Sequence, residues 1–476
     1  MKELYKKDIF PIGAYCSPQP PATVNGVEYP SRITLEQYQM LADLGVNLVY
    51  AHNEVFGTDT EKYAFEALDL AEKVGVKVFV RDRIAREYAM TAGDNDKWYK
   101  TLTQEEKDAL DKRFEESLKR YCKHPAFGGI SFWDEPGYDA LEGIGAAKRV
   151  FDRVCPNKTF YVNMYPYYIS PEQYQFGYWA GLRTECKATI PEFAVREDGR
   201  NIERYKKLYE GAVEIAKLDL FSYDAYPFTP LGEGGETGVH EVLWEMPQYL
   251  QGMEKKYGLP FWSFLQVGGQ WEGRKEVRVS NLGETWLGVS VPLLYGAKGL
   301  QLFPYMLPNE WISDSKVDAG VVNARGEKTE RYGWYKDIFA HVQAMSKTLL
   351  RSKLKNILCV GEYENGIDEE KFSKVKWNEC VFRGVLSECE NITVKKYGDV
   401  KKVTSSSQCL IGCFDTNGRE TYLLVNNSSV YSTEVEMEFR SNFMRIITQK
   451  GKKHRSGGKY FSVELSAGEC VLIERA

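Results

Sequence analysis

Two acidic residues of this chain lie among aromatic residues at the ends of apolar runs. Glu135 follows Trp133 and Asp134 in the segment GGISFWDEP, and Asp224 lies two residues before Tyr226 in FSYDAYPF. Glycoside hydrolysis needs such a pair: one carboxylic acid protonates the leaving oxygen, and a second carboxylate attacks the anomeric carbon or activates water. Aromatic rings suit the faces of sugar rings, and by excluding water they raise the pKa of a neighbouring acid. We therefore predict Glu135 as the general acid and Asp224 as the nucleophile or base.

Each of these acids also has a structural interpretation. Glu135 has the alternative of an ion pair with an arginine, Arg81 or Arg83. Asp134 orients Glu135, binds a substrate hydroxyl, or caps the helix that follows it. Asp224 has the alternative of a structural hydrogen-bonding role. The residue types alone leave these alternatives open.

Further polar and aromatic residues follow the other apolar runs. A few well-placed polar groups among aromatic side chains are typical of a site that orients a small ligand. We predict that the following residues bind the substrate: His52, Asn53, Arg81, Trp133, Asp134, Asn163, Tyr165, Tyr226, Gln266, Trp271 and Tyr305. For His52, a satisfied position in the core or at the rim is the competing interpretation.

The first 350 residues alternate between strand-like and helix-like segments. The strand-like runs are short, apolar and rich in β-branched and aromatic residues. They lie near residues 9–15, 46–52, 76–82, 127–133, 159–165, 218–226, 260–266 and 299–305. Amphipathic helical patterns lie between them, and DLGVNLVY and EKVGVKVFV place a glycine between helix and strand. Eight such units in a row predict an α/β fold, a TIM (β/α)8 barrel over residues 1–350.

A barrel would bring the candidate residues together, because its active site lies at the C-terminal ends of the strands. A doubly wound sheet is the alternative fold. Such a sheet normally carries a glycine-rich phosphate loop after its first strand. Here CSPQPPATVNG follows the first strand, so we discount this alternative.

The pattern changes near residue 350. Short alternating runs such as CLIGCFD, ETYLLVNNS and ECVLIER replace the helical segments. They predict a C-terminal all-β sandwich domain over residues 351–476. Cys409 and Cys413 lie an even number of residues apart in one run and so share one face, where packing is favoured over zinc binding. This domain packs on the barrel, builds a homo-oligomer or binds carbohydrate; the sequence leaves these alternatives open.

The composition excludes several kinds of partner and cofactor. Lys and Arg number 62 against 67 Asp and Glu, so the net charge of 62 − 67 = −5 argues against nucleic acid as a partner. No apolar run reaches the roughly 18 residues that span a membrane. Five histidines without HxH or HExxH, and ten cysteines without CxxC, predict no metal site. The scattered cysteines predict reduced thiols in a cytoplasmic protein, and the N-terminal segment has no signal-like apolar stretch. We expect no cofactor.

Several segments resemble the clan A TIM-barrel glycoside hydrolases, particularly the β-galactosidase-like barrels, across residues 8–350. GGISFWDEP resembles the strand-four segment that carries their acid/base glutamate, and Glu135 is the matching residue. PFWSFLQVGGQW resembles the strand-seven segment, and ETWLGVSVPLLYGAKGLQLFPYM and VVNARGEKTERYGWYKDI resemble the segments after it. SYDAYPF is similar to relatives in which a Tyr-Asp pair recurs at this point. The resemblance implies a glycosidase with an oligosaccharide or glycoside substrate.

The strand-seven segment departs from that family. Its members carry the nucleophilic glutamate there, whereas this chain has Phe-Leu-Gln at 264–266, with Glu272 displaced beyond it. Three hypotheses remain: Asp224 replaces the missing group, a loop carboxylate such as Glu272 or Glu310 supplies it, or the site binds glycans without cleaving them. A lyase or isomerase would need a metal cluster, a Schiff-base lysine or a phosphate site, and we find no convincing candidate at the strand ends.

Overall fold

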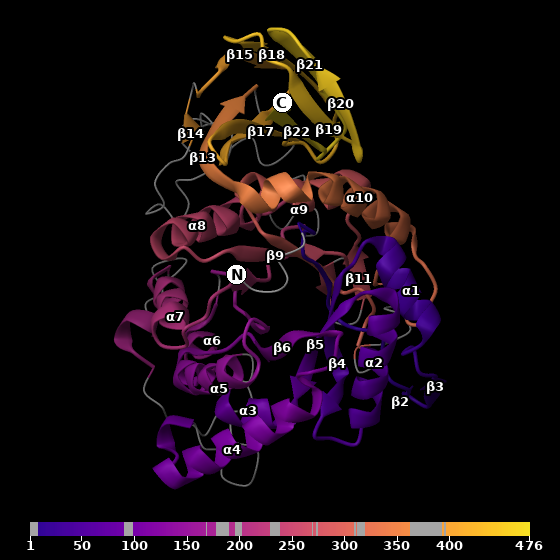
Figure 1. The fold of residues 1–476 in the computed structure, drawn as a ribbon, viewed down its shortest axis with the longest axis vertical. Coiled ribbons are helices and arrows are strands. Elements are labelled where there is room, and N and C mark those ends of the chain that lie inside the picture. Colours follow the sequence, from indigo (N-terminus) through magenta and orange to yellow (C-terminus); the bar gives the residue numbers. More distant parts are fainter. Residues whose placement is uncertain are drawn as a thin grey trace. The chain divides into compact units, whose positions relative to one another are not determined.

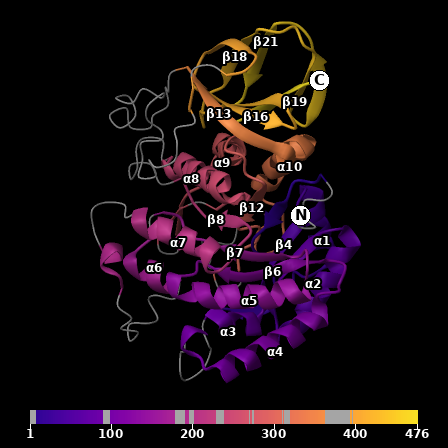
Figure 2. The same cartoon turned by 60° about the vertical axis from the view of Figure 1, so that its left-hand side comes forward.

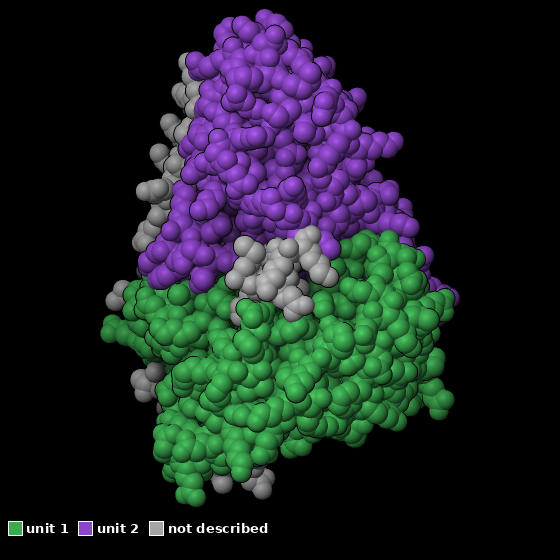
Figure 3. Space-filling view, viewed as in Figure 1, with its two compact units in different colours: residues 1–7, 13–224, 308–310 green, residues 8–12, 225–307, 311–476 purple. Residues whose placement is uncertain are grey.

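The computed structural model of this chain describes most of its residues. The described residues are 8–89, 99–167, 169–177, 190–195, 202–228, 239–268, 270–272, 275–308, 311, 319–361, 393–394 and 397–476, with backbone only at 202, 270–272, 275–278 and 393–394. Their contacts group into two compact units, coloured separately in Figure 3. Unit 1 is built mainly from Gly13–Asp224, and unit 2 mainly from Ala225–Leu307 and Trp311–Ala476 together with Asp8–Ile12.

A sheet of eight strands forms the barrel (Figures 1 and 2). Its strands are β1 (Ile12–Ala14), β4 (Leu48–Phe56), β5 (Lys77–Asp82), β6 (Phe127–Asp134), β7 (Thr159–Asn163), β8 (Phe221–Tyr223), β9 (Phe261–Gln266) and β12 (Gly299–Phe303). Their order is β7-β6-β5-β4-β1-β12-β9-β8. A parallel bridge between Met164 and Tyr223 joins the two outer strands, β7 and β8, and so closes the sheet. Each strand overlaps a run predicted from the sequence, and the TIM barrel is confirmed.

Helices connect these strands along the chain. They are α1 (Leu35–Leu44), α2 (Glu61–Val74), α3 (Arg83–Ala89), α4 (Gln104–Tyr121), α5 (Leu141–Val154), α6 (Pro171–Phe176), α7 (Ile202–Glu214), α8 (Val242–Tyr257), α9 (Leu282–Leu294) and α10 (Glu330–Arg351). Gly45 ends α1 with φ 93° and Gly75 ends α2 with φ 76°, a left-handed conformation that glycine adopts without steric cost. Both predicted helix–glycine–strand joints are therefore confirmed. Within the described ranges, no helix is long and apolar enough to cross a membrane.

Aromatic rings fill part of the barrel interior in unit 1. The centroid of the Tyr50 ring lies 5.2 Å from that of Tyr15, 5.2 Å from that of Phe79 and 4.7 Å from that of Tyr161. Gly13 on β1 lies against the same ring, because a Cβ atom at this position would be 2.6 Å from Cε2 of Tyr50. Only glycine allows this approach, and the ring cluster in turn holds the Tyr161 hydroxyl in place for the polar contacts described below.

Two short hairpins accompany the barrel strands. They are formed by β2 (Ala22–Val24) with β3 (Val27–Tyr29), and by β10 (Gln270–Glu272) with β11 (Lys275–Arg278). Single 3-10 turns cover Tyr99–Thr101, Tyr138–Ala140 and Glu192–Val195.

The last part of the chain forms two sheets in unit 2. One contains, in order, β14 (Thr393–Val394), β13 (Ser352–Val360), β16 (Cys409–Thr416), β17 (Arg419–Asn426), β22 (Cys470–Arg475), β19 (Arg445–Gln449) and β20 (Lys452–Ser456); the other contains β15 (Val400–Ser405), β18 (Thr433–Phe439) and β21 (Tyr460–Leu465). Buried side chains of both sheets form one core, including Tyr422 from the first and Met437 from the second. Cys409 and Cys413 both lie in this core, so the predicted sandwich and the packing role of these cysteines are confirmed.

The predicted domain boundary between residues 350 and 351 stays a prediction. In the structure α10 ends at Arg351 and β13 begins at Ser352, so the change from helix to strand falls beside this point.

Candidate active site

Three acidic residues of unit 1 lie at the C-terminal ends of barrel strands. Asp134 is the last residue of β6, Glu135 follows it directly, and Asp224 follows β8. Asn163 ends β7 and lies opposite Asp134 in the register of the two strands. Because the bridge described above joins β7 to β8, the three acids gather around Asn163, at the end of the barrel where the sequence placed the active site.

Glu135 adopts a backbone conformation that is rare for residues other than glycine. Its φ is 52°, in the left-handed region, and its N–H donates to the carbonyl oxygen of Asn163 at 2.9 Å. In a regular strand, Glu135 and Asp134 would point to opposite sides of the sheet. The left-handed turn ends that alternation. Strained residues of this kind persist where their surroundings hold them, and they cluster at functional sites.

Glu135 and Asp224 form a hydrogen-bonded pair of carboxyl groups. Two carboxyl groups share a hydrogen bond only when one of them is protonated. Burial, followed by the negative charges of Asp224 and Asp134, raises the pKa of Glu135 far above its ordinary value. Burial and the charge of Asp134 raise the pKa of Asp224 less, because hydrogen bonds from Glu135 and Asn163 favour its ionised form. Glu135 is therefore the member of the pair that keeps a proton near neutral pH.

A chain of hydrogen bonds fixes the amide of Asn163. Ser222 Oγ donates to Asn163 Oδ1 at 3.0 Å, and Asn163 Nδ2 donates to Asp134 Oδ1 at 3.0 Å. Tyr161 and Ser222 share a hydrogen bond of 2.8 Å between their hydroxyls. Ser222 has one hydroxyl proton and donates it to Asn163, so the Tyr161 hydroxyl must be the donor in the bond between Tyr161 and Ser222. The order of donors therefore aims the NH2 group of Asn163 at the acidic residues.

Asp134 is the acid that has positive neighbours. Its side chain keeps exposed surface, but the groups packed around the carboxyl raise its pKa above the ordinary value by desolvation. The charges of Arg81 and His52, with a hydrogen bond from Tyr15, oppose that rise. Arg81 Nη1 also donates to the carbonyl oxygen of His52 at 2.8 Å, which holds these two residues together. The alternative that Asp134 caps the next helix is wrong, because Gly137 occupies the N-cap of that turn.

The alternative pairing of Glu135 with an arginine has no support. Among the described residues, no ion pair joins Glu135 to Arg81 or Arg83, and Arg83 is exposed. The groups that act on the Glu135 carboxyl are instead the two other acids and the hydroxyl of Tyr165.

One buried polar atom of this cluster, Oδ1 of Asp224, lacks a hydrogen-bond partner among the described residues, whereas the Tyr165 hydroxyl is hydrogen-bonded to Glu135. Asp224 is 8% exposed and Tyr165 is 3% exposed. An unpaired buried polar group costs about 1–3 kcal/mol, so it needs an explanation. A water molecule or a ligand would supply the missing partner.

Glu54 belongs to this region and was missed by the sequence analysis. It lies two residues after His52 on β4 and is 1% exposed. One carboxylate oxygen accepts from the Ser17 hydroxyl and the other from the His52 N–H at 3.2 Å. Burial raises the pKa of Glu54 to about 7, against the effect of these bonds. The signal in the sequence was an acid two positions after His52, on the same side of a strand.

The side chain of Asn53, beside Glu54, makes a hydrogen bond within unit 1. Its Nδ2 donates to Gln19 Oε1 at 2.8 Å. Trp133 on β6 is half-buried. A substrate-binding role for these two residues stays a prediction.

The residues predicted from the later strands lie in unit 2. Gln266 ends β9, and its amide accepts from the N–H of Phe228 and donates to the carbonyl of Phe228, both at 2.9 Å. Tyr226 is half-buried, with its ring centroid 5.6 Å from that of Phe303. Tyr305 has no exposed surface. The amide of Gln266 is thus committed to the backbone, and substrate binding by Gln266, Tyr226 and Tyr305 stays a prediction.

Three residues named from the sequence fall outside the described parts. They are the side chains of Trp271 and Glu272, and the whole of Glu310. Across the residues that are described, no group of three or more His, Cys, Asp or Glu is arranged to hold a metal ion.

Comparisons with known proteins agree with this fold. No family model and no curated protein matches the chain. Among solved structures, Gan42B, a GH42 β-galactosidase from G. stearothermophilus, matches with a TM-score of 0.57 and 9% identity, over 99% of this chain and 99% of that one. Another structure, described as a glycoside hydrolase, matches with a TM-score of 0.50 and 10% identity, over 98% of this chain and 92% of that one. The chain therefore shares the fold of these glycoside hydrolases, a TIM barrel followed by further β-sheets, as the sequence segments indicated.

Proposed function

We propose that this protein hydrolyses glycosidic bonds in oligosaccharides or glycosides, with Glu135 as the general acid. The observation that carries the proposal is the gathering of Asp134, Glu135 and Asp224 at the C-terminal ends of β6 and β8, on either side of β7. A general acid must hold its proton at the working pH, and burial together with two neighbouring carboxylates does this for Glu135. The likeness of the fold to glycoside hydrolases supports carbohydrate as the substrate class.

Asp224 is the second carboxylate of the proposed site. It keeps the proton on Glu135 until a glycosidic oxygen enters, and Glu135 then transfers the proton to that oxygen as the bond to the anomeric carbon breaks. In one route Asp224 forms a bond to the anomeric carbon, and water later displaces it there and gives a proton to the Glu135 carboxylate. In the other route water bonds to the anomeric carbon directly and gives its proton to Asp224. Asn163 and Asp134 hold the arrangement through the hydrogen bond between them.

Glycan binding without cleavage is the second candidate function. The absence of a carboxylate at the end of β9, where Gln266 stands, favours it. In this case the same residues would hold a sugar, and replacing the Glu135 carboxyl by an amide would leave binding largely unchanged.

A hydrolysis screen separates the two functions. Wild type and Glu135→Gln would be incubated with aryl α- and β-glycosides and with oligosaccharides, and released aglycone and new reducing ends would be measured. We expect activity in wild type that is lost in Glu135→Gln, least for aryl leaving groups that depart without a proton. Glu105→Gln is the matched control, because Glu105 is exposed on α4. If wild type and Glu135→Gln bind glycans equally and neither cleaves them, the protein is a glycan-binding protein and the hydrolase proposal is wrong.

A further inference from the structure

The turn that carries Glu135 has to be held in place by other parts of the chain. Its φ of 52° is disfavoured for a residue with a side chain, and such a conformation persists only where the surroundings fix it. On the N-terminal side, the hydrogen bond from the Glu135 N–H to the carbonyl oxygen of Asn163 provides one support. The carbonyl side of the turn must be held by other contacts.

Two glycines lie against that side of the turn. Gly177 ends α6 with φ 78° and ψ −161°, a conformation that essentially only glycine adopts. A Cβ atom on Gly177 would lie 2.6 Å from the carbonyl oxygen of Glu135. A Cβ atom on Gly137 would lie 2.4 Å from the nitrogen of Gly177 and 2.5 Å from the carbonyl oxygen of Gln175. Both distances are too short for real side-chain atoms, so the backbone after Glu135 packs directly on the end of α6.

The helix that receives this contact is itself fixed at its start. Ser170 Oγ accepts from the Gln173 N–H at 3.1 Å, and the Gln173 side chain accepts from the Ser170 N–H at 2.8 Å, which is a complete capping box. Tyr174 in the same helix stacks on Tyr138, with the ring centroids 5.5 Å apart. The short helix α6 therefore forms a fixed support on which the turn rests.

We propose that Gly137 and Gly177 are positioning residues, whose backbone contact holds the left-handed turn of Glu135 and so keeps the Glu135 carboxyl beside Asp224. The contact acts through the main chain, because the atom that a larger residue would displace is the carbonyl oxygen of Glu135. The ring of Pro136 fixes its own φ, so a shift of that oxygen has to be taken up at Glu135. This inference rests on the proposed function, because it assigns the residues that position its general acid.

Gly137→Ala tests the contact without changing the backbone preference. Gly137 has φ −84° and ψ 170°, which alanine also adopts, so the added methyl group acts only through its contact with α6. Gly333→Ala is the matched control, because a Cβ atom at Gly333 would meet nothing within 4 Å. Gly177→Ala should act in the same direction. Its control is Gly75→Ala, because Gly75 ends α2 with φ 76° and also has open space around a Cβ atom.

Steady-state kinetics over a range of pH provide the first measurement. Gly137→Ala should lower kcat/KM by about 10–100-fold, mainly through kcat, because a displacement of about 1 Å in the site can cost this much. The alkaline limb of kcat/KM should also move to lower pH, because Glu135 then lies farther from the negative charge of Asp224 and loses its proton more readily. A role in stability alone changes neither quantity per folded molecule. Unchanged kinetics in Gly137→Ala, with only a lower free energy of unfolding, would overturn the inference.

Titration of Glu135 provides a second measurement that needs no turnover. Its carboxyl carbon would be followed by NMR in protein labelled at glutamate, with Glu135→Gln to assign the signal. We expect Glu135 to ionise at lower pH in Gly137→Ala than in wild type and in Gly333→Ala. The same titration in all three proteins would overturn the inference. If wild type cleaves no substrate, the hydrolase proposal fails, and this titration still decides whether the two glycines position Glu135.

Ser170→Ala keeps the inference testable if the glycine variants fail to fold. It removes the capping box of α6 and adds no atoms to the contact. The end of α6 is then less well fixed, so the changes in kinetics and in titration should have the same direction and be smaller. Thr103→Ala removes the corresponding capping box of α4 and is the matched control. Equal kinetics and equal titration in these two variants would contradict the role of α6 as the support of the acid.

Discussion

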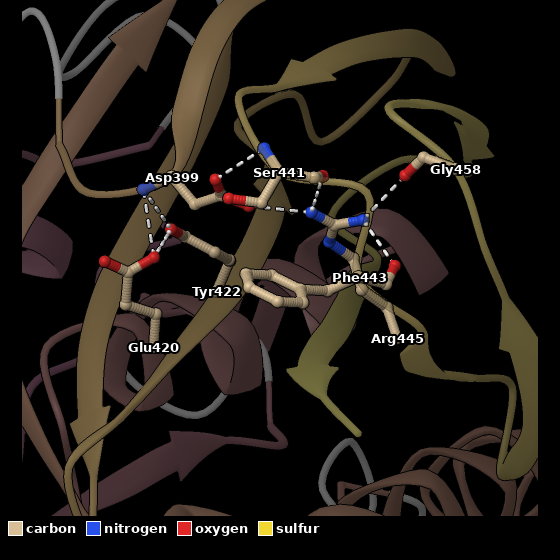
Figure 4. A network of polar contacts seen from close by, with 7 residues as sticks. All are labelled: Asp399, Glu420, Tyr422, Ser441, Phe443, Arg445 and Gly458. Carbon is tan, nitrogen blue, oxygen red and sulfur yellow. Dashed lines mark hydrogen bonds and ion pairs between the residues drawn. The ribbon is translucent and has the colours of Figure 1, made fainter.

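Two polar clusters of this protein contain similar side chains but differ in how their charges are paired. In the β-sandwich, Asp399 accepts from Arg445 Nη2 at 2.8 Å and from the Ser441 N–H at 2.8 Å, and its own N–H donates to Glu420 at 2.9 Å (Figure 4). Arg445 Nη1 also donates to the carbonyl of Gly458 at 2.8 Å. In this cluster, opposite charges meet and the donors have acceptors.

The acidic cluster of unit 1 is arranged differently. Asp134, Glu135 and Asp224 bring like charges together, and the pKa values of all three are raised. Oδ1 of Asp224 has no hydrogen-bond partner among the described residues. Paired opposite charges stabilise the fold in the sandwich cluster, whereas like charges held close together lower stability in the acidic cluster. The gathering of like charges at the strand ends thus distinguishes the acidic cluster from the sandwich cluster.

Glu135→Gln should have the largest effect on activity. Loss of the general acid should lower kcat/KM by about 10²–10⁴-fold for substrates with poor leaving groups. Its stability should stay equal or rise, because an amide removes an ionisable group from an acidic cluster. Steady-state kinetics and urea unfolding beside Glu105→Gln measure both. A loss of stability with unchanged kcat/KM would show that Glu135 has a structural role.

Arg445→Met should lower the free energy of unfolding and leave catalytic activity unchanged, which is the opposite of the effect expected for Glu135→Gln. It leaves Asp399 without its charged partner, and breaking a buried ion pair in this way costs about 3–5 kcal/mol. The side chains of Arg445 and Asp399 are only 6% and 15% exposed, so solvent replaces little of the loss. Urea unfolding should detect the change, while kcat/KM per folded molecule stays the same. Arg455→Met, at an exposed position, is the control.

Asp224→Asn should shift the pH dependence of the reaction. The negative charge of Asp224 raises the pKa of Glu135, so an amide at this position lowers that pKa. The alkaline limb of kcat/KM, where Glu135 loses its proton, should move to lower pH by about one unit or more. Profiles recorded beside Asp59→Asn test this, and an unmoved alkaline limb would show that Asp224 does not control the acid.

The same pair should affect the pH dependence of stability. A carboxyl group whose pKa is raised in the folded state stabilises the fold below its unfolded pKa, and this contribution is lost as pH rises through the folded pKa. The unfolding free energy of wild type should therefore fall with increasing pH more steeply than that of Asp224→Asn.

Glu54→Gln should have the smallest effect. The glutamine still accepts from the His52 N–H, and the Ser17 hydroxyl rotates to accept, so the cost should be about 1 kcal/mol. Because the pKa of Glu54 is raised to about 7, wild type loses a stabilising contribution as pH rises through that value, and the variant does not. Unfolding curves at several pH values, beside exposed Glu66→Gln, measure this difference. Parallel curves at every pH would contradict the raised pKa.

The sequence alone determined the barrel, the sandwich and the strand ends that carry the candidate acids. Local patterns suffice for these features: apolar runs form strands, Gly45 and Gly75 end helices, and alternation buries Cys409 with Cys413. Position at a strand end was enough to select Glu135 and Asp224, because parallel barrel strands all end on one side.

Only the tertiary structure decided how these residues act on one another. The left-handed turn at Glu135 and the bridge from β7 to β8 bring Glu135 and Asp224 into contact, and the amide of Gln266 is bound by Phe228. Burial makes Glu54 part of the same region. A pKa and an unsatisfied hydrogen bond depend on neighbours contributed by other strands, across long sequence separations. The sequence around a residue does not specify those neighbours, so its pKa and hydrogen bonding could not be predicted from that segment.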